Sequence, residues 1–151
     1  MEAAIAAARE TMARGAGGPF GACIVKDGQI LATSGNRVLE LHDPTAHAEV
    51  NAIRMACSAA HSHLLQGAEI YSTTEPCPMC FAAIHWAQIA TVIFGTHIAD
   101  VARLGFNELP ITNEAMNAMG GSPIRLIAGY MEHESRELLE SWAQMGQHIT
   151  Y

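Results

Sequence analysis

The chain has 151 residues, half of them hydrophobic, and a formal net charge of -7. This length fits one ordinary domain, residues 1–151, with a single core, and the hydrophobic fraction excludes a disordered chain. No apolar run reaches the roughly 20 residues that cross a bilayer. No basic run is present that could follow a phosphate backbone. Composition therefore argues against a membrane protein and against a nucleic-acid partner.

The amino-terminal residues and the cysteines bear on the compartment. The first nine residues are rich in alanine, contain Glu2 and lack the basic start and cleavage site of a secretory signal, so we expect a short amphipathic helix in a cytoplasmic protein. In such a chain, the spacing of Cys77 and Cys80 favours metal or redox chemistry over a disulfide. Cys23 and Cys57 lie among small apolar residues and are expected to be small buried side chains.

Apolar runs and turn signals predict alternating strands and helices. Two short apolar runs, 20–26 and 29–33, flank Asp27-Gly28, which predicts an amino-terminal β-hairpin. A helix is expected to begin near His47, because Val50, Ile53 and Cys57 recur at helical spacing. Further along we expect strands at residues 68–73, 91–95 and 124–130, and helices at residues 78–87, opened by proline, and 132–145. Residues 96–123 are expected to be irregular.

This order of elements is typical of an α/β layer structure, in which helices cover both faces of a largely parallel sheet. Such sheets bind ligands at the carboxyl ends of their strands. The helix starts near His47 and Cys77 are expected at that edge.

Two short motifs, His47-Ala48-Glu49 and Pro76-Cys77-Pro78-Met79-Cys80, carry the candidate chemistry. Two cysteines three residues apart place both sulfurs on one side of a first helical turn, where backbone N–H groups favour thiolate. His47 would complete three protein ligands and leave a fourth tetrahedral position for water, as in catalytic zinc sites. Bound zinc lowers the pKa of water toward about 7, and Glu49 is placed to move protons beside it.

Each motif alone has a plainer interpretation. A lone C-x-x-C is as often a redox pair, and a lone H-x-E usually marks a surface helix start. A structural zinc site would need a fourth ligand, for which His42 is the candidate nearest in sequence. The remaining histidines are expected to face solvent or fill polar pockets: His61, His63, His85, His97, His133 and His148.

Together the motifs resemble the H-x-E and P-C-x-x-C signature of zinc deaminases. Over nearly the whole chain, the sequence resembles the bacterial guanine deaminases of the cytidine-deaminase-like superfamily. The stretches that carry this resemblance are residues 17–22, 35–36, 43–49, 75–80, 86–87, 105–106 and 151. It implies hydrolysis of guanine to xanthine and ammonia, in purine catabolism or salvage, with one zinc ion per chain. It also implies a three-layer α/β/α fold around a mixed five-stranded sheet, and a homodimer that exchanges carboxy-terminal segments from about residue 131 to 151.

The resemblance assigns roles to residues outside the zinc motifs. Asn36 matches a position that contacts the purine edge, and Phe20 one that lines the purine face. Glu108 matches a second carboxylate near the departing amine, although Asn107 replaces an acid of the family pattern beside it. Without the resemblance, Glu108 would be interpreted as a solvated loop carboxylate.

Two aromatic residues have competing interpretations. Trp86 matches a pocket aromatic, but it could equally pack in the core. Tyr151 would ordinarily be a frayed terminal residue, whereas the resemblance makes it a lid over a neighbour's active site. Arg103, Asn113 and Glu114 receive no role.

Two other functions stay open. The zinc motifs do not distinguish guanine from a cytosine nucleoside, an aminated triazine or adenosine in tRNA, although the acidic balance argues against tRNA. A non-enzymatic domain stabilised by zinc is the alternative from a different class.

Overall fold

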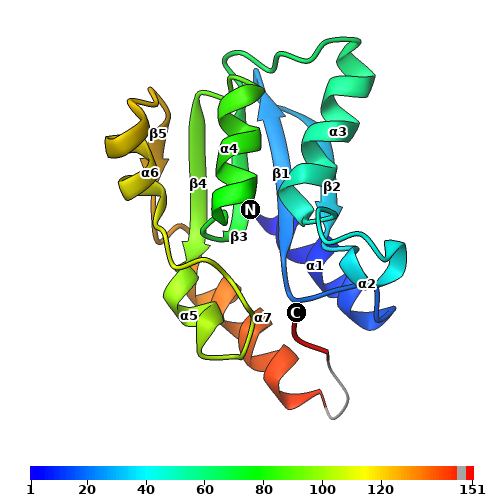
Figure 1. Ribbon diagram of the computed structural model, residues 1–151. Helices are drawn as coiled ribbons and strands as arrows, with labels where there is room; N and C mark the ends of the chain where they lie inside the picture. The colour runs from blue at the N-terminus through cyan, green and yellow to red at the C-terminus, as the bar shows by residue number, and fades with distance from the viewer. Residues whose placement is uncertain (146–148) are drawn as a thin grey trace.

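A mixed five-stranded sheet in the order β2-β1-β3-β4-β5 forms the centre of the computed structural model, which describes residues 1–145 and 149–151 (Figure 1). β1 pairs antiparallel with both β2 and β3, whereas β3, β4 and β5 pair in parallel. β2 therefore runs in the same direction as β3, β4 and β5, and the carboxyl ends of these four strands share one edge. The strands span Gly21–Lys26 (β1), Gln29–Gly35 (β2), Glu69–Thr74 (β3), Thr91–Thr96 (β4) and Arg125–Ile127 (β5).

The amino-terminal hairpin is confirmed. Asp27 and Gly28 have φ angles of 52° and 74°, the left-handed conformation that tight hairpin turns require at both central residues. β1 and β2 pair on either side of this turn, from Lys26 opposite Gln29 to Gly21 opposite Gly35.

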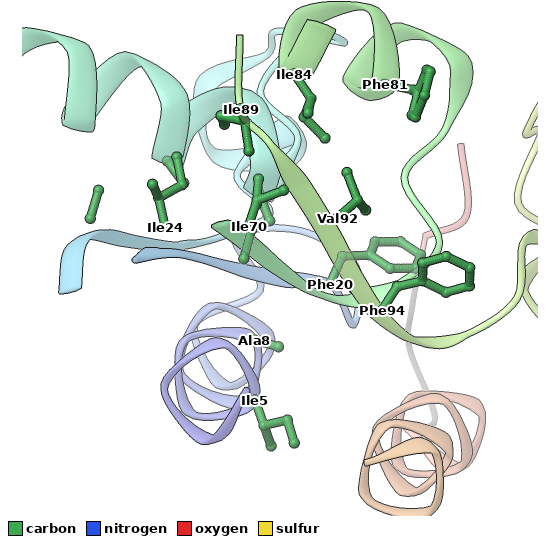
Figure 2. Close-up of a cluster of buried hydrophobic side chains, with 14 of the residues drawn as sticks. Ile5, Ala8, Phe20, Ile24, Ile70, Phe81, Ile84, Ile89, Val92 and Phe94 are labelled. Atoms are coloured by element: carbon green, nitrogen blue, oxygen red, sulfur yellow. The ribbon is translucent and has the colours of Figure 1, made fainter. Parts of the chain in front are cut away.

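Helices cover both faces of the sheet, so the expected three-layer architecture is confirmed. α3 (Ala48–Ala60) and α4 (Pro78–Trp86) lie on one face, and α1 (Glu2–Ala13) and α7 (Glu132–Gln144) lie on the other (Figures 1 and 2). The core fills both interfaces. Figure 2 shows its side chains, including Ile5, Ile24, Ile70, Ile84 and Phe94, on either side of the strands.

Two glycines let the α1 and α7 layer approach the sheet closely. A Cβ atom on Gly21 would lie 1.9 Å from the carbonyl oxygen of Ala4 in α1. A Cβ atom on Gly95 in β4 would lie 2.2 Å from Oγ of Ser135 in α7. Side chains at these positions would push the helices outward.

The buried face of α3 differs from the expected one. Val50, Ile53 and Cys57 are only half-buried, and the fully buried apolar positions are Ala48, Ala52 and Ala56. These small side chains let the helix lie close on β1 and β2, so the larger apolar residues fall at the margin of the contact. Cys23 is buried as expected, but Cys57 is not.

The stretch 96–123, expected to be irregular, contains two helices: α5 (Ile98–Ala102) and α6 (Asn113–Gly120). The boundaries of α6 have ordinary sequence signals, because Thr112 Oγ1 accepts a hydrogen bond from the Ala115 N–H and Gly121 adopts a left-handed conformation after the helix. Three smaller differences concern length. The first helix extends to Ala13, the last strand has three residues, and a short helix α2 (Val38–Leu41) was not predicted.

Within the described residues, every helix is too short or too polar to cross a bilayer.

Gly95→Ala is expected to lower the free energy of unfolding by about 1–3 kcal/mol, because the added methyl group overpacks the contact between β4 and α7. Urea denaturation followed by circular dichroism measures the change. Gly120→Ala is the matched control, since a Cβ atom there meets nothing within 4 Å. Equal urea midpoints for the two variants would contradict this account of the packing.

Candidate metal centre and active site

Three candidate metal ligands meet at the edge where β2, β3 and β4 end. His47 is the N-cap residue of α3, and Cys77 is the N-cap residue of α4, with Pro78 in its first turn. Cys80 lies one turn into α4 and is fully buried. Both helices start at this edge because the strands that precede them run in the same direction.

The separations of the three ligand atoms fit a tetrahedral zinc ion. Nδ1 of His47 lies 3.6 Å from the Cys77 sulfur and 3.5 Å from the Cys80 sulfur. Zinc–sulfur distances of about 2.3 Å and zinc–nitrogen distances of about 2.0–2.1 Å in a tetrahedron place sulfur and nitrogen about 3.6 Å apart. These three residues form the one cluster of possible metal ligands found among the described residues.

The thiols of Cys77 and Cys80, the two cysteine ligands, differ in pKa. A hydrogen bond from Cys80 and interactions with His47 lower the pKa of the Cys77 thiol to about 4, against the effect of burial. The same contact with Cys77, together with burial and the nearby Glu49, raises the pKa of Cys80 well above its usual range. The lowered pKa of Cys77 favours its thiolate form, and Cys80 would have to release its proton to act as a metal ligand.

Glu49 is a buried carboxylic acid beside the cysteines. One carboxylate oxygen accepts a 2.7 Å hydrogen bond from Ser72 in β3, and the other lies 3.4 Å from the Cys80 sulfur. Burial raises the pKa of Glu49. Ser72 holds the carboxyl group so that its other oxygen faces the metal ligands, and a raised pKa would suit a group that both accepts and releases a proton. The sequence interpretation assigned no role to Ser72, although it is a polar residue in a buried strand that ends at the site.

Phe20 and Glu108 line the same small cavity as His47, Glu49 and Cys77. Its volume is about 10 Å³, room for roughly one water molecule. Burial and the Cys77 charge raise the pKa of Glu108 to about 7, against the effect of His47. Glu108 thus lies at the cavity, and its role as a second catalytic carboxylate stays a prediction.

Asn107 does not disturb this placement of Glu108. It is exposed to solvent, and its backbone N–H donates to the terminal carbonyl of Tyr151 at 3.0 Å. The change from the acidic family pattern therefore leaves Glu108 at the cavity.

Asn36 and Tyr151 lie against each other. The Tyr151 hydroxyl accepts a 2.9 Å hydrogen bond from the Gly18 N–H and donates to Oδ1 of Asn36, which also accepts from the Val38 N–H. Burial raises the pKa of Tyr151 to about 12, so this hydroxyl stays protonated. Asn36 is fully buried, and its Nδ2 has no hydrogen-bond partner in the described part of the chain. In one chain, Tyr151 thus docks on the chain's own Asn36.

The position of Trp86 in the single chain differs from both positions that the sequence suggested, the pocket and the core. Its side chain is 79% exposed, so it is not in the core, and it lines a surface hollow of about 520 Å³ at the far end of α4 rather than the cavity at Cys77. Trp86 is the last of the nine residues of α4, at the opposite end of the helix from Cys77. A single chain therefore does not bring Trp86 to the metal ligands.

The other histidines do not complete a fourth ligand. His42 is exposed at the end of α2 and outside the metal cluster. The remaining described histidines are also exposed to solvent: His61, His63, His85, His97 and His133. His148 lies outside the described residues.

The family of the cytidine and deoxycytidylate deaminase zinc-binding region matches residues 1–96, which include all three metal ligands and Glu49. The chain belongs to this deaminase family. The chain is therefore a zinc enzyme that hydrolyses carbon–nitrogen bonds in cyclic amidines, and the interpretations as a redox pair or a purely structural zinc domain are excluded.

Individual relatives of this deaminase differ in substrate. The guanine deaminase of Bacillus subtilis (strain 168) is 45% identical over 114 residues, which cover 76% of this chain and 73% of the relative. A tRNA-specific adenosine deaminase of Agrobacterium fabrum is 53% identical over 77 residues, about half of each chain. The solved structure of a guanine deaminase from Nitrosomonas europaea is 26% identical, with a TM-score of 0.84 over 93% of this chain and 80% of that one.

Replacing a metal ligand should remove zinc without removing the fold. We expect about one zinc per chain in the unaltered deaminase and substantially less in Cys80→Ser, because a hydroxyl is a poorer zinc ligand than a thiolate. Atomic absorption on protein purified without chelators measures the content. Cys57→Ser is the matched control and should keep its zinc, since Cys57 lies outside the cluster. Equal metal contents in the two variants would refute the ligand assignment.

Proposed function

We propose that this deaminase hydrolyses guanine to xanthine and ammonia. The observation that carries the proposal is that the buried Glu49 and the half-buried Glu108 line one cavity at the metal ligands. Removing an exocyclic amine from a purine needs proton transfer at a ring nitrogen and a grip on the departing nitrogen. Two separate carboxyl groups supply both.

Bound zinc would be held by His47, Cys77 and Cys80 and would polarise a water molecule at its remaining position. Glu49 takes a proton from the attacking water and passes it to the ring nitrogen beside C2 of guanine. The water oxygen bonds to C2, the bond from C2 to the exocyclic nitrogen breaks, and ammonia leaves with the second water proton. Glu108 holds the amine as it departs. Ser72 keeps Glu49 in place through the whole sequence.

Asn36 supports recognition of a purine edge. Tyr151 and the Val38 N–H occupy Oδ1 of Asn36, so the amide is oriented with Nδ2 free to donate. A ring nitrogen or carbonyl oxygen of guanine would accept this hydrogen bond. Phe20 offers an aromatic face beside it, packed edge-on against Phe106 at a centroid distance of 5.0 Å.

The charges on the surface argue against tRNA as the substrate. Of the eight lysines and arginines, seven form ion pairs with carboxylates, which leaves Lys26 of the hairpin turn. Exposed pairs add little stability, but they neutralise the cations that phosphate contacts need. Arg37 and Arg54, which lie close in sequence to Asn36 and His47, pair with Glu40 and Asp43.

A cavity of about 10 Å³ is far smaller than a purine, so binding requires part of its lining, such as the segment that carries Glu108, to move. A free base that binds under such a cover is shielded from bulk water. A polynucleotide would need the cover to stay open. This geometry favours a small substrate. The cytoplasmic location of the enzyme and its role in purine catabolism or salvage remain predictions.

Guanine should be turned over with release of ammonia, and Glu49→Gln should lower kcat by about 10²- to 10⁴-fold, the usual contribution of a general acid–base group. An ammonia assay with guanine, cytidine and an adenosine-containing tRNA anticodon stem-loop measures both. Glu114→Gln, an exposed carboxyl in α6, is the matched control and should keep full activity.

Turnover of the stem-loop or of cytidine without turnover of guanine would overturn the substrate and leave the deaminase family intact. Full activity in Glu49→Gln would instead overturn the mechanism.

We propose in addition that the deaminase is a homodimer through the outer face of α4. This helix is apolar on its outer side as well as its inner side: Met79, Ala82 and Ala83 are half-buried, and Trp86 is mostly exposed. A helix that is apolar all round belongs in an interior, and exposed tryptophan is a common anchor of interfaces. A second copy packed on this face in a two-fold arrangement would bury it.

Exchange of carboxy-terminal segments in this dimer is tested by mixing two inactive chains, Glu49→Gln and Tyr151→Ala, through joint unfolding and refolding. If the terminal residue acts on the partner, mixed dimers pair an intact Glu49 with an intact Tyr151. Half the dimers are mixed and half of their sites are complete, so activity should recover to about a quarter of the wild-type value.

Trp86→Glu in both chains is the control, because loss of the dimer should remove the recovery and give a monomer in analytical ultracentrifugation. Failure to recover in a mixture that does form dimers would show that Tyr151 acts within its own chain.

A further inference from the structure

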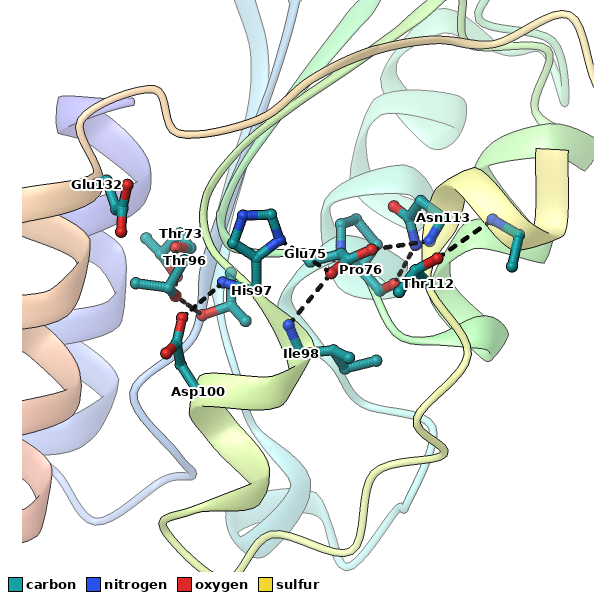
Figure 3. A network of polar contacts seen from close by, with 12 residues as sticks. Thr73, Glu75, Pro76, Thr96, His97, Ile98, Asp100, Thr112, Asn113 and Glu132 are labelled. Carbon is teal, nitrogen blue, oxygen red and sulfur yellow. Dashed lines mark hydrogen bonds and ion pairs between the residues drawn. The ribbon is translucent and has the colours of Figure 1, made fainter. Parts of the chain in front are cut away.

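Glu75, two residues before Cys77, is a buried carboxyl group that is not one of the candidate metal ligands. Its side chain is almost fully buried, and its carboxylate accepts hydrogen bonds from the backbone N–H groups of Ile98 at 3.2 Å and Asn113 at 2.8 Å (Figure 3). Nδ1 of His97 lies 3.5 Å from the same carboxylate. A buried carboxylate is costly unless such donors compensate it. Its position is therefore set by two backbone groups that open two different helices.

The side chain of Asn113 forms a second contact with the stretch that contains Glu75 and Pro76. Its side chain is fully buried, and Nδ2 donates to the carbonyl oxygen of Pro76 at 2.7 Å. On the opposite side, the Glu75 N–H donates to the carbonyl oxygen of Thr96 at 2.8 Å. The dipeptide that leads into Cys77 is thus fixed from both sides.

The two helices that meet at Glu75 bound the segment that carries Glu108. α5 begins at Ile98 and α6 begins at Asn113, and residues 103–112 connect them. Glu108 lies in this connection, and it lines the same cavity as Glu75. One carboxylate therefore ties the helices on both sides of the Glu108 segment to the peptide that delivers a metal ligand.

We propose that Glu75 and Asn113 are positioning residues for deamination, which fix the separation between Glu108 and the metal centre. The proposal rests on the proposed role of Glu108, and it does not depend on which aminated base is the substrate. Neither residue touches the reacting atoms in this assignment. Their effect passes through Glu108 and Cys77.

A double-mutant cycle separates this role from a general contribution to stability. Glu75→Gln keeps the shape of the side chain but replaces one acceptor oxygen with a donor, so one of the two backbone hydrogen bonds is lost. In the unaltered enzyme we expect kcat to fall about 10- to 100-fold, as for a small misplacement of a catalytic group. In a Glu108→Gln background, the same substitution should lower kcat less than about threefold, because the group that it positions is already absent.

The cycle uses whichever base the unaltered enzyme deaminates fastest. A failure of the guanine assignment therefore changes the substrate of the assay and not its logic. Glu114→Gln is again the matched control, since this carboxyl is adjacent to Asn113 but exposed.

Asn113→Ala is the second variant. It leaves the backbone hydrogen bond to Glu75 and removes only the bond to Pro76. We expect the zinc content to stay near one per chain, and a colorimetric chelator to remove zinc several-fold faster, because the peptide that leads into Cys77 is less constrained. This readout does not depend on activity.

Three results would overturn the proposal. The first is that Glu75→Gln keeps kcat within twofold of the unaltered enzyme. The second is that Glu75→Gln costs the same factor with and without Glu108. The third is that neither Glu75→Gln nor Asn113→Ala accumulates as folded, zinc-containing protein, because the network would then serve folding alone.

Discussion

Three metal ligands from two distant parts of the chain must meet within a few ångströms, and strand direction makes this possible. β1 is antiparallel to both of its neighbours, so β2 and β3 run the same way although they are not adjacent. The helices that follow these strands therefore begin at one edge. His47 and Cys77 occupy the first position of each helix, and Cys80 is one turn further along. A reversal of β1 relative to either neighbour would place the imidazole and the thiolates at opposite edges.

The metal ligands and the residues proposed to bind the substrate have different structural supports. The ligands and Glu49 lie at the starts of α3 and α4, and Glu49 is held by Ser72 of the central strand β3. Phe20, Asn36, Glu108 and Tyr151 come from loops and from the end of the chain. If these residues do select the substrate, their place outside the strands would let one deaminase centre serve relatives with different substrates. This division explains why one chain resembles both a guanine deaminase and a tRNA adenosine deaminase.

The sequence predicted the sheet, the hairpin and the metal ligands because each depends on local patterns. Asp27-Gly28 specifies its turn, and proline after Cys77 specifies a helix start. The role of Glu75 and Asn113 depends on contacts between residues up to 38 positions apart, which no local pattern encodes. The buried face of α3 was misplaced for a related reason. Alanine is a weak hydrophobic signal, yet its small size decides how closely a helix lies on a sheet.

Trp86 shows a different limit of sequence reasoning. An aromatic residue in an apolar helix is expected to be inside, and this expectation assumes that the chain alone forms the interior. The end of α4 carries apolar residues on both sides, so its outward face cannot be interpreted from one chain. In the proposed dimer Trp86 would be covered, and an apolar pattern alone does not separate a core from an interface.

The two helices at the centre begin on residues that do not cap them. Neither His47 nor Cys77 forms the side-chain hydrogen bond to the first turn that a serine, threonine or aspartate would form at this position. Zinc held by His47, Cys77 and Cys80 would join these two helix starts directly. Zinc binding would then be coupled to folding by mass action, and the stability of the enzyme would rise with the concentration of free zinc. When zinc is scarce, the amount of folded enzyme should respond as well as its activity.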